Sequence, residues 1–237
     1  MHKERELADK YGKVRPVIHA GWRGKRWIAV GDLLLSSSQW KTFVDFLGDY
    51  IKFVLTPEWG MQELAKPLQQ RHVIMQWYER VCGFQKEHIG TAGEIVQFVP
   101  SGVVAAYFSL AYDLYLLNHH QCLQTSLVRR LKHSDQFQGA RYELFAAATA
   151  LRAGFDLHFE DESDGRSKHP EFIATHIATG QKVAIEAKSR HRDGVLGRLG
   201  RTPKGDVSSY CGRPLFGAGL YVWQDRHEWR PAGKYTT

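Results

Sequence analysis

The stretch QFQGARYELFAAATALRAGFDLHFEDE, residues 136–162, passes from a helical to a β pattern within a few residues. Its alanine-rich part predicts a helix that ends at Gly154, because glycine readily takes the left-handed conformation that closes helices. Short runs of apolar or β-branched residues follow at 155–160, 171–178 and 182–189, as expected of strands. A glycine in the turn ATGQK joins the last two runs into a hairpin. The order helix, strand, strand, strand therefore predicts a small α/β domain.

The sequence upstream of this stretch has helical patterns. Apolar residues at helical spacing predict a helix over about 39–55. Pro57 and Pro67 stand where new helices can begin, and Gly83 stands where the second of these would stop. Further helices are therefore expected near 57–65 and 67–82 and from about 103 to 131. The aromatic residues of this region recur at helical spacing, which is typical of a core. They are Trp40, Phe43, Phe46, Tyr50, Trp59, Trp77 and Tyr78.

These patterns predict an α+β or α/β fold with three parts. Residues 1–36 form an N-terminal arm to which no shape is assigned, residues 37–131 form a helical domain, and residues 135–237 form the α/β domain. A chain of 237 residues is long enough to bury a substantial core in such domains.

Composition limits the classes of function. The formal net charge of +7 and the pI of about 9.3 favour polyanionic partners such as nucleic acid. Cys82, Cys122 and Cys211 are odd in number and far apart, which predicts neither a disulfide framework nor a zinc ribbon and fits a reducing cytoplasm. The N-terminus MHKERELADKYGK lacks the apolar core of a signal peptide, and the apolar run at 103–117 is too short to span a bilayer. We therefore expect a cytoplasmic protein without a membrane span.

Polar side chains gather on the last predicted strand and on its neighbours. Because side chains alternate along a strand, Ala184, Glu186 and Lys188 share one face, while the apolar face opposite packs. Glu171 begins the preceding strand, from which it can approach Glu186 across the hairpin. Glu143 lies on a helical stripe of small residues that lets its helix sit close to a sheet. A basic cluster follows directly, made up of Arg190, Arg192, Arg198, Arg201 and Lys204.

This ordered set resembles the core of the PD-(D/E)XK nuclease superfamily, the restriction-endonuclease-like fold with a mixed sheet. GARYELFAAATALRAGF resembles the first helix of that core, HPEFIA its Pro-acid segment and IEAK its (D/E)XK signature, over about 137–192. The resemblance implies that Glu171 and Glu186 bind magnesium or manganese, with the backbone carbonyl of Ala187 as a further ligand. It also implies that Lys188 positions or deprotonates the attacking water or stabilises charge on phosphate, and that Glu143 is an accessory acid.

Three acids in the preceding loop, Asp161, Glu162 and Asp164, are alternatives to Glu171. The expected function is metal-dependent hydrolysis of phosphodiester bonds by a nuclease acting on DNA, with RNA as the other substrate. The basic cluster would then neutralise backbone phosphates with little base selectivity. One alternative is a non-catalytic nucleic-acid-binding or assembly protein with a degenerate nuclease fold, in which Glu186 and Lys188 merely pair. Another is a homo-oligomer that the α/β part stabilises.

Overall fold

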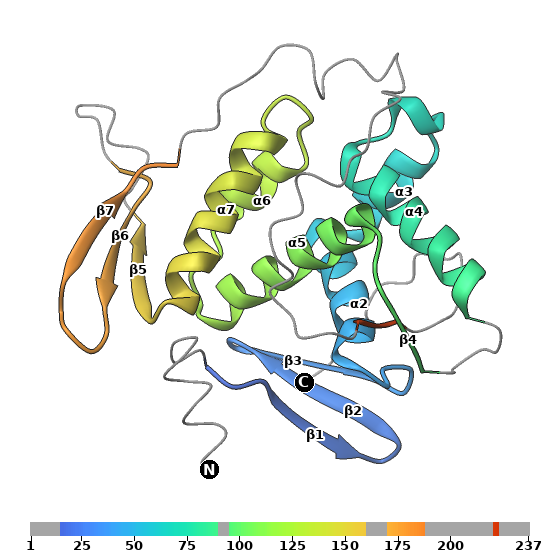
Figure 1. Ribbon diagram of the computed structural model, residues 1–237, viewed down its shortest axis with the longest axis horizontal. Helices are drawn as coiled ribbons and strands as arrows, with labels where there is room; N and C mark the ends of the chain where they lie inside the picture. The colour runs from blue at the N-terminus through green and yellow to red at the C-terminus, as the bar shows by residue number, and fades with distance from the viewer. Residues whose placement is uncertain (1–14, 90–94, 160–169, 188–219, 223–237) are drawn as a thin grey trace. The chain divides into compact units, whose positions relative to one another are not determined.

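A computed structural model describes residues 15–89, 95–159, 170–187 and 220–222 (Figure 1). These residues divide into two compact units. The first contains 15–21, 27–36, 113–159 and 170–187, and the second contains 22–26, 37–89, 95–112 and 220–222. Helices and small antiparallel sheets make up both, so the α+β class is confirmed. The restriction-endonuclease-like core and the three-part domain division stay predictions.

The region before residue 38 contains a three-stranded meander, β1 (Ile18–Trp22), β2 (Lys25–Val30) and β3 (Leu33–Ser37), in the order β1-β2-β3. Two-residue turns join its strands, which is possible only for antiparallel neighbours. Along β2, Ile28 and Val30 are buried, whereas every residue of β1 is exposed. The meander therefore presents β1 to solvent.

Helix α2 (Phe43–Leu55) begins four residues later than the predicted start, because Thr42 caps it. The Thr42 side chain accepts from the backbone N–H of Asp45, and the Asp45 carboxylate accepts from that of Thr42, which completes a capping box. Pro57 opens α3 (Pro57–Leu64), as predicted. Of the aromatics predicted to form a core, Trp40, Phe46 and Tyr50 are buried and the others are half-buried.

Two predicted boundaries in the helical region are wrong. Pro67 precedes only the short 3-10 helix η1 (Leu68–Gln70), and the α-helix that follows, α4 (Val73–His88), runs through Gly83. A glycine inside a helix costs about 1 kcal/mol relative to alanine. Phe84 offsets that cost, because its ring stacks on His88 at 4.0 Å between centroids and meets Phe98 at 4.6 Å.

The long helical stretch expected to reach residue 131 is two helices, α5 (Gly102–His119) and α6 (Thr125–Leu131). Gln121 adopts a φ of 58°, which reverses the chain between them. Helix α5 is apolar around most of its circumference and is largely buried, as predicted for the run at 103–117. In the part of the chain that the structure describes, no helix has the length and apolarity needed to cross a membrane.

Helix α7 (Phe137–Arg152) and strands β5 (Phe155–Phe159), β6 (Phe172–His176) and β7 (Lys182–Ile185) follow in the predicted order (Figure 1). Gly154, with a φ of 84°, closes α7. The three strands form an antiparallel sheet in the order β5-β6-β7.

A short strand, β8 (Leu220–Val222), pairs antiparallel with β4 (Val96–Phe98). These two strands form a sheet of their own, so β8 does not extend the β5-β6-β7 sheet. Every strand pair whose register the structure describes is antiparallel, so the mixed sheet also stays a prediction.

Candidate functional site

The register of the β6–β7 hairpin sets the positions of two predicted metal ligands. Phe172 pairs with Ile185 at the end of the ladder. The same register continued by one residue places Glu171 opposite Glu186. Residues directly opposite on antiparallel strands have Cβ atoms about 4.5–5.5 Å apart, so two carboxylates at such positions can reach one cation.

The turn of this hairpin holds that register in place. The His176 backbone N–H donates to the Gln181 carbonyl over 2.8 Å, and the Gly180 N–H donates to the His176 carbonyl over 2.8 Å. Gly180 has a φ of 70°, a conformation that favours glycine. A slip of one residue would turn every side chain of β7 to the other face, so these bonds also decide on which face Glu186 lies.

The open end of the hairpin is more exposed than the strand pattern predicts. Among the described strands β7 is an edge of its sheet, and Val183, predicted to pack, is 48% exposed. Glu171 and Ala187 are half-buried and Glu186 is exposed. The two carboxylates therefore stand where water and a large substrate have access.

Glu143 has a partner that the sequence did not reveal. It lies on α7 with 2% of its surface exposed, and its Oε2 is 2.7 Å from Nη2 of Arg130 on α6. A buried carboxylate requires such a counter-charge, because removing an ion from water is costly. The pair ties α6 to α7, which is a structural role beside the predicted role as accessory acid.

The other predicted site residues fall outside the described residues: Lys188, the basic cluster of Arg190, Arg192, Arg198, Arg201 and Lys204, and the alternative acids Asp161, Glu162 and Asp164. Within residues 15–89, 95–159, 170–187 and 220–222, no group of three or more His, Cys, Asp or Glu side chains is arranged to hold a metal ion. The predicted site has two carboxylates and a backbone carbonyl, so this finding does not bear on it.

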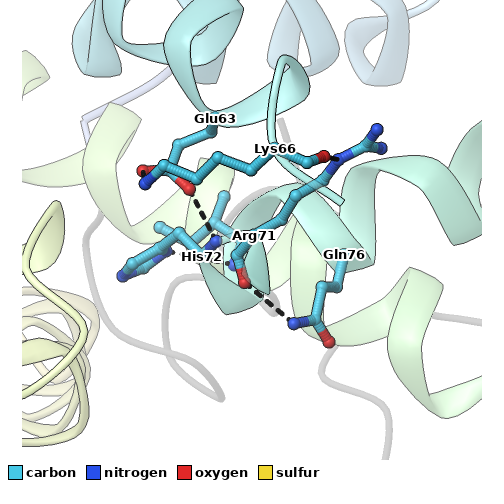
Figure 2. A network of polar contacts seen from close by, with 6 residues as sticks. Glu63, Lys66, Arg71, His72 and Gln76 are labelled. Atoms are coloured by element: carbon cyan, nitrogen blue, oxygen red, sulfur yellow. Dashed lines mark hydrogen bonds and ion pairs between the residues drawn. The ribbon is translucent and has the colours of Figure 1, made fainter. Parts of the chain in front are cut away.

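A second group of charged residues, which sequence reasoning missed, joins α3 to α4 (Figure 2). Glu63 Oε1 accepts from Lys66 Nζ over 2.6 Å, and its Oε2 accepts from the backbone N–H of His72 over 2.7 Å. The Arg71 Nε donates to the Lys66 carbonyl, and the Gln76 side chain donates to the Arg71 carbonyl, each over 2.8 Å. The spacing of Glu63 and Lys66, three residues apart across the end of α3, is the signal that could have found it.

This network is a structural device. Burial raises the pKa of the Glu63 carboxyl, but the Lys66 ammonium and the His72 amide outweigh it and lower the pKa overall. Glu63 is thereby ionised at neutral pH with both oxygens engaged, and it satisfies the N–H of the residue that caps α4. The negative charge of Glu63 therefore stabilises the connection between α3 and α4.

The cysteines of the described residues do not offer a nucleophile. Burial raises the pKa of the Cys122 thiol to about 12, and burial also raises the pKa of Cys82. Since the thiolate is the reactive form, both are inert at neutral pH. Covalent thiol catalysis is therefore not supported at either position.

The chain matches no protein-family model, no curated protein and no solved structure. The resemblance to the PD-(D/E)XK superfamily thus rests on the motifs in the sequence. The geometry that bears on it is the order of α7, β5, β6 and β7 and the register that relates Glu171 to Glu186.

Proposed function

We propose that the protein is a metal-dependent nuclease that hydrolyses phosphodiester bonds in DNA. The observation that carries this proposal is the β6–β7 register, which ends at Phe172 opposite Ile185 and, extended by one residue, would set Glu171 opposite Glu186 at the accessible end of the hairpin. The resemblance also implies that a helix with small residues precedes an antiparallel hairpin in the catalytic core. Helix α7 and strands β6 and β7 follow in that order.

The donor set suits a hard divalent cation. Glu171 and Glu186 supply carboxylate oxygens and Ala187 supplies a backbone carbonyl, the ligand types that magnesium and manganese prefer. A bound cation would neutralise charge on phosphate and lower the pKa of a water molecule. Two acids and a carbonyl leave coordination positions for water and for a phosphate oxygen.

The remaining chemistry falls to Lys188 and to water. The water oxygen attacks phosphorus and releases a proton to solvent, the bond from phosphorus to the leaving oxygen breaks, and the leaving oxygen takes a proton from solvent. The Lys188 ammonium would stabilise the negative charge that develops on the phosphate oxygens. The basic cluster that follows, Arg190 to Lys204, would hold the flanking phosphates and make binding sensitive to salt.

The test is cleavage of supercoiled and single-stranded DNA with magnesium or manganese, with and without EDTA. Glu171→Gln, Glu186→Gln and Lys188→Ala are expected to reduce cleavage about a hundredfold or more while DNA binding survives. Glu87→Gln, which neutralises an exposed carboxylate on α4, is the control and is expected to cut as the wild type does.

Binding of DNA by the wild type without any metal-dependent cleavage would contradict the proposal and favour the non-catalytic nucleic-acid-binding protein. Cleavage that survives Glu186→Gln would also contradict it, because the site cannot lose one of its two carboxylate ligands without effect. Calorimetric titration with manganese adds an independent readout, since both Glu→Gln variants are expected to bind the ion more weakly.

A further inference from the structure

The tip of the β1–β2 hairpin, residues Trp22–Arg26, stands out for its exposure. Every residue from Arg15 to Arg26 is exposed, and burial begins only at Ile28 on β2. Trp22 is 57% exposed, although tryptophan is a large apolar side chain that proteins usually bury. The hairpin tip thus presents its side chains to solvent.

The tip is strongly basic. It carries Arg23, Lys25 and Arg26, and no acidic residue occurs between positions 15 and 31. Within the part of the chain that the structure describes, none of these three cations forms an ion pair. Their charge is therefore available to an anionic partner.

A cation lies over the exposed aromatic ring. The Arg23 guanidinium carbon is 4.3 Å from the centroid of the Trp22 ring. Indole and guanidinium are both planar groups that stack on nucleic-acid bases, and each keeps its shape at little conformational cost. Proteins that bind single-stranded nucleic acid combine such stacking side chains with positively charged residues that contact the phosphates.

Arg23 lies in a turn whose backbone conformation is unfavourable for arginine. Arg23 and Gly24 form the two-residue loop between β1 and β2, with φ values of 49° and 71°. Positive φ at both positions is the type I′ pattern, in which asparagine followed by glycine is preferred. Arginine at the first position is conformationally costly, as is common where a residue serves binding and not stability.

We infer that this hairpin tip binds single-stranded nucleic acid, with Trp22 and Arg23 stacking on unpaired bases and with Lys25 and Arg26 contacting phosphates. Unpaired bases expose the faces that Trp22 can stack on, which a duplex conceals. A surface that binds a membrane usually inserts several apolar side chains, whereas the tip carries one aromatic residue among three cations. The inference concerns binding alone and does not depend on cleavage at the carboxylate site.

Fluorescence anisotropy with a labelled single-stranded oligothymidylate, in EDTA, tests this inference. We expect Trp22→Ala to weaken binding about fivefold to a hundredfold, the value of one base stack. Arg23→Asn is expected to weaken binding through the loss of a stacking group. Lys25→Gln is expected to lower the slope of log affinity against log salt by about 0.7, as for the loss of one phosphate contact. Because asparagine suits the turn, Arg23→Asn should unfold at the same or a higher urea concentration than the wild type.

Matched changes elsewhere serve as controls. Arg80→Asn removes an exposed cation from α4, and Tyr142→Ala removes an aromatic that is 47% exposed on α7. Both should bind the oligothymidylate as the wild type does. Unchanged affinity in Trp22→Ala and Arg23→Asn would overturn the inference, as would tighter binding to duplex DNA or to anionic phospholipid vesicles. Since no metal is present, the result is independent of whether the carboxylate site cleaves.

Discussion

The ion pair between Glu143 and Arg130 should contribute measurably to the stability of the fold. Replacing Glu143 by alanine should destabilise the fold by about 3 kcal/mol, because it removes the carboxylate that lies 2.7 Å from the partly buried Arg130 guanidinium. The measured range for breaking buried pairs is about 3–5 kcal/mol. The Arg130 side chain is 25% exposed against 3% for Glu143, so water can partly solvate it, which sets the expectation at the lower end.

Urea unfolding followed by tryptophan fluorescence measures this value. The midpoint should fall in Glu143→Ala without a change in the slope of free energy against urea, which would show that stability changed and compactness did not. Arg130→Met should cost a similar amount, since it removes the guanidinium that lies 2.7 Å from the buried Glu143 carboxylate. The double variant Arg130→Met/Glu143→Leu should lie within about 2 kcal/mol of the wild type, because both members of the ion pair are replaced by apolar side chains.

Two outcomes would contradict this expectation. A cost below about 1 kcal/mol for Glu143→Ala would mean that the pair contributes no more than a surface salt bridge. Strict additivity of Arg130→Met and Glu143→Leu, each also measured alone, would mean that the side chains do not interact energetically.

The double variant also separates the structural role of Glu143 from its proposed catalytic role. If Glu143 is an accessory acid, the folded double variant cuts DNA poorly. If Glu143 only holds α6 to α7, the double variant cuts as the wild type does, and the metal site needs Glu171 and Glu186 alone.

Three further predictions concern stability. Burial raises the pKa of the Asp113 carboxyl to about 6 from 3.8, against the effect of Arg152, whose Nη1 lies 2.8 Å from Oδ1. Because the folded pKa is the higher one, stability from this group is full below about pH 4 and is lost as the pH rises through 6. Wild type should therefore lose about 3 kcal/mol relative to Asp113→Asn between those pH values in urea titrations. Gly31→Ala should cost about 2 kcal/mol or more in the same assay, since Gly31 has a φ of 60° and a Cβ there would lie 2.7 Å from the Asn118 carbonyl oxygen. Thr42→Ala removes the cap of α2 and should lower the thermal midpoint, at a cost of about 1 kcal/mol, while Thr42→Ser should restore it.

Local signals carried most of the secondary structure around the proposed site. The alanine-rich pattern and Gly154 predicted α7 and its end, because a helix and its C-terminal cap depend on a few neighbouring residues. The β6–β7 hairpin was predicted for the same reason, since Gly180 supplies the turn and the alternating residues supply the strands. The position of Glu171 across from Glu186 extends that register by one residue and stays a prediction.

Local signals failed where distant residues decide the outcome. Gly83 does not stop α4, which continues to His88 with the Phe84 ring packed against Phe98 on β4. The pairing of β4 with β8 joins residues more than a hundred positions apart, and nothing in either short strand specifies the other. The meander before residue 38 was missed because its exposed first strand lacks the alternation that signals a half-buried strand.

Helix α7, strands β5, β6 and β7 and the basic charge of the chain follow from the sequence alone. The burial of Glu143 against Arg130, the contact of Glu63 with the start of α4 and the exposure of Trp22 at the β1–β2 tip emerge only in the folded chain. The physical reason is that backbone conformation responds to a few neighbouring residues. Burial and charge pairing depend on which segments pack together, and that is settled across the whole chain.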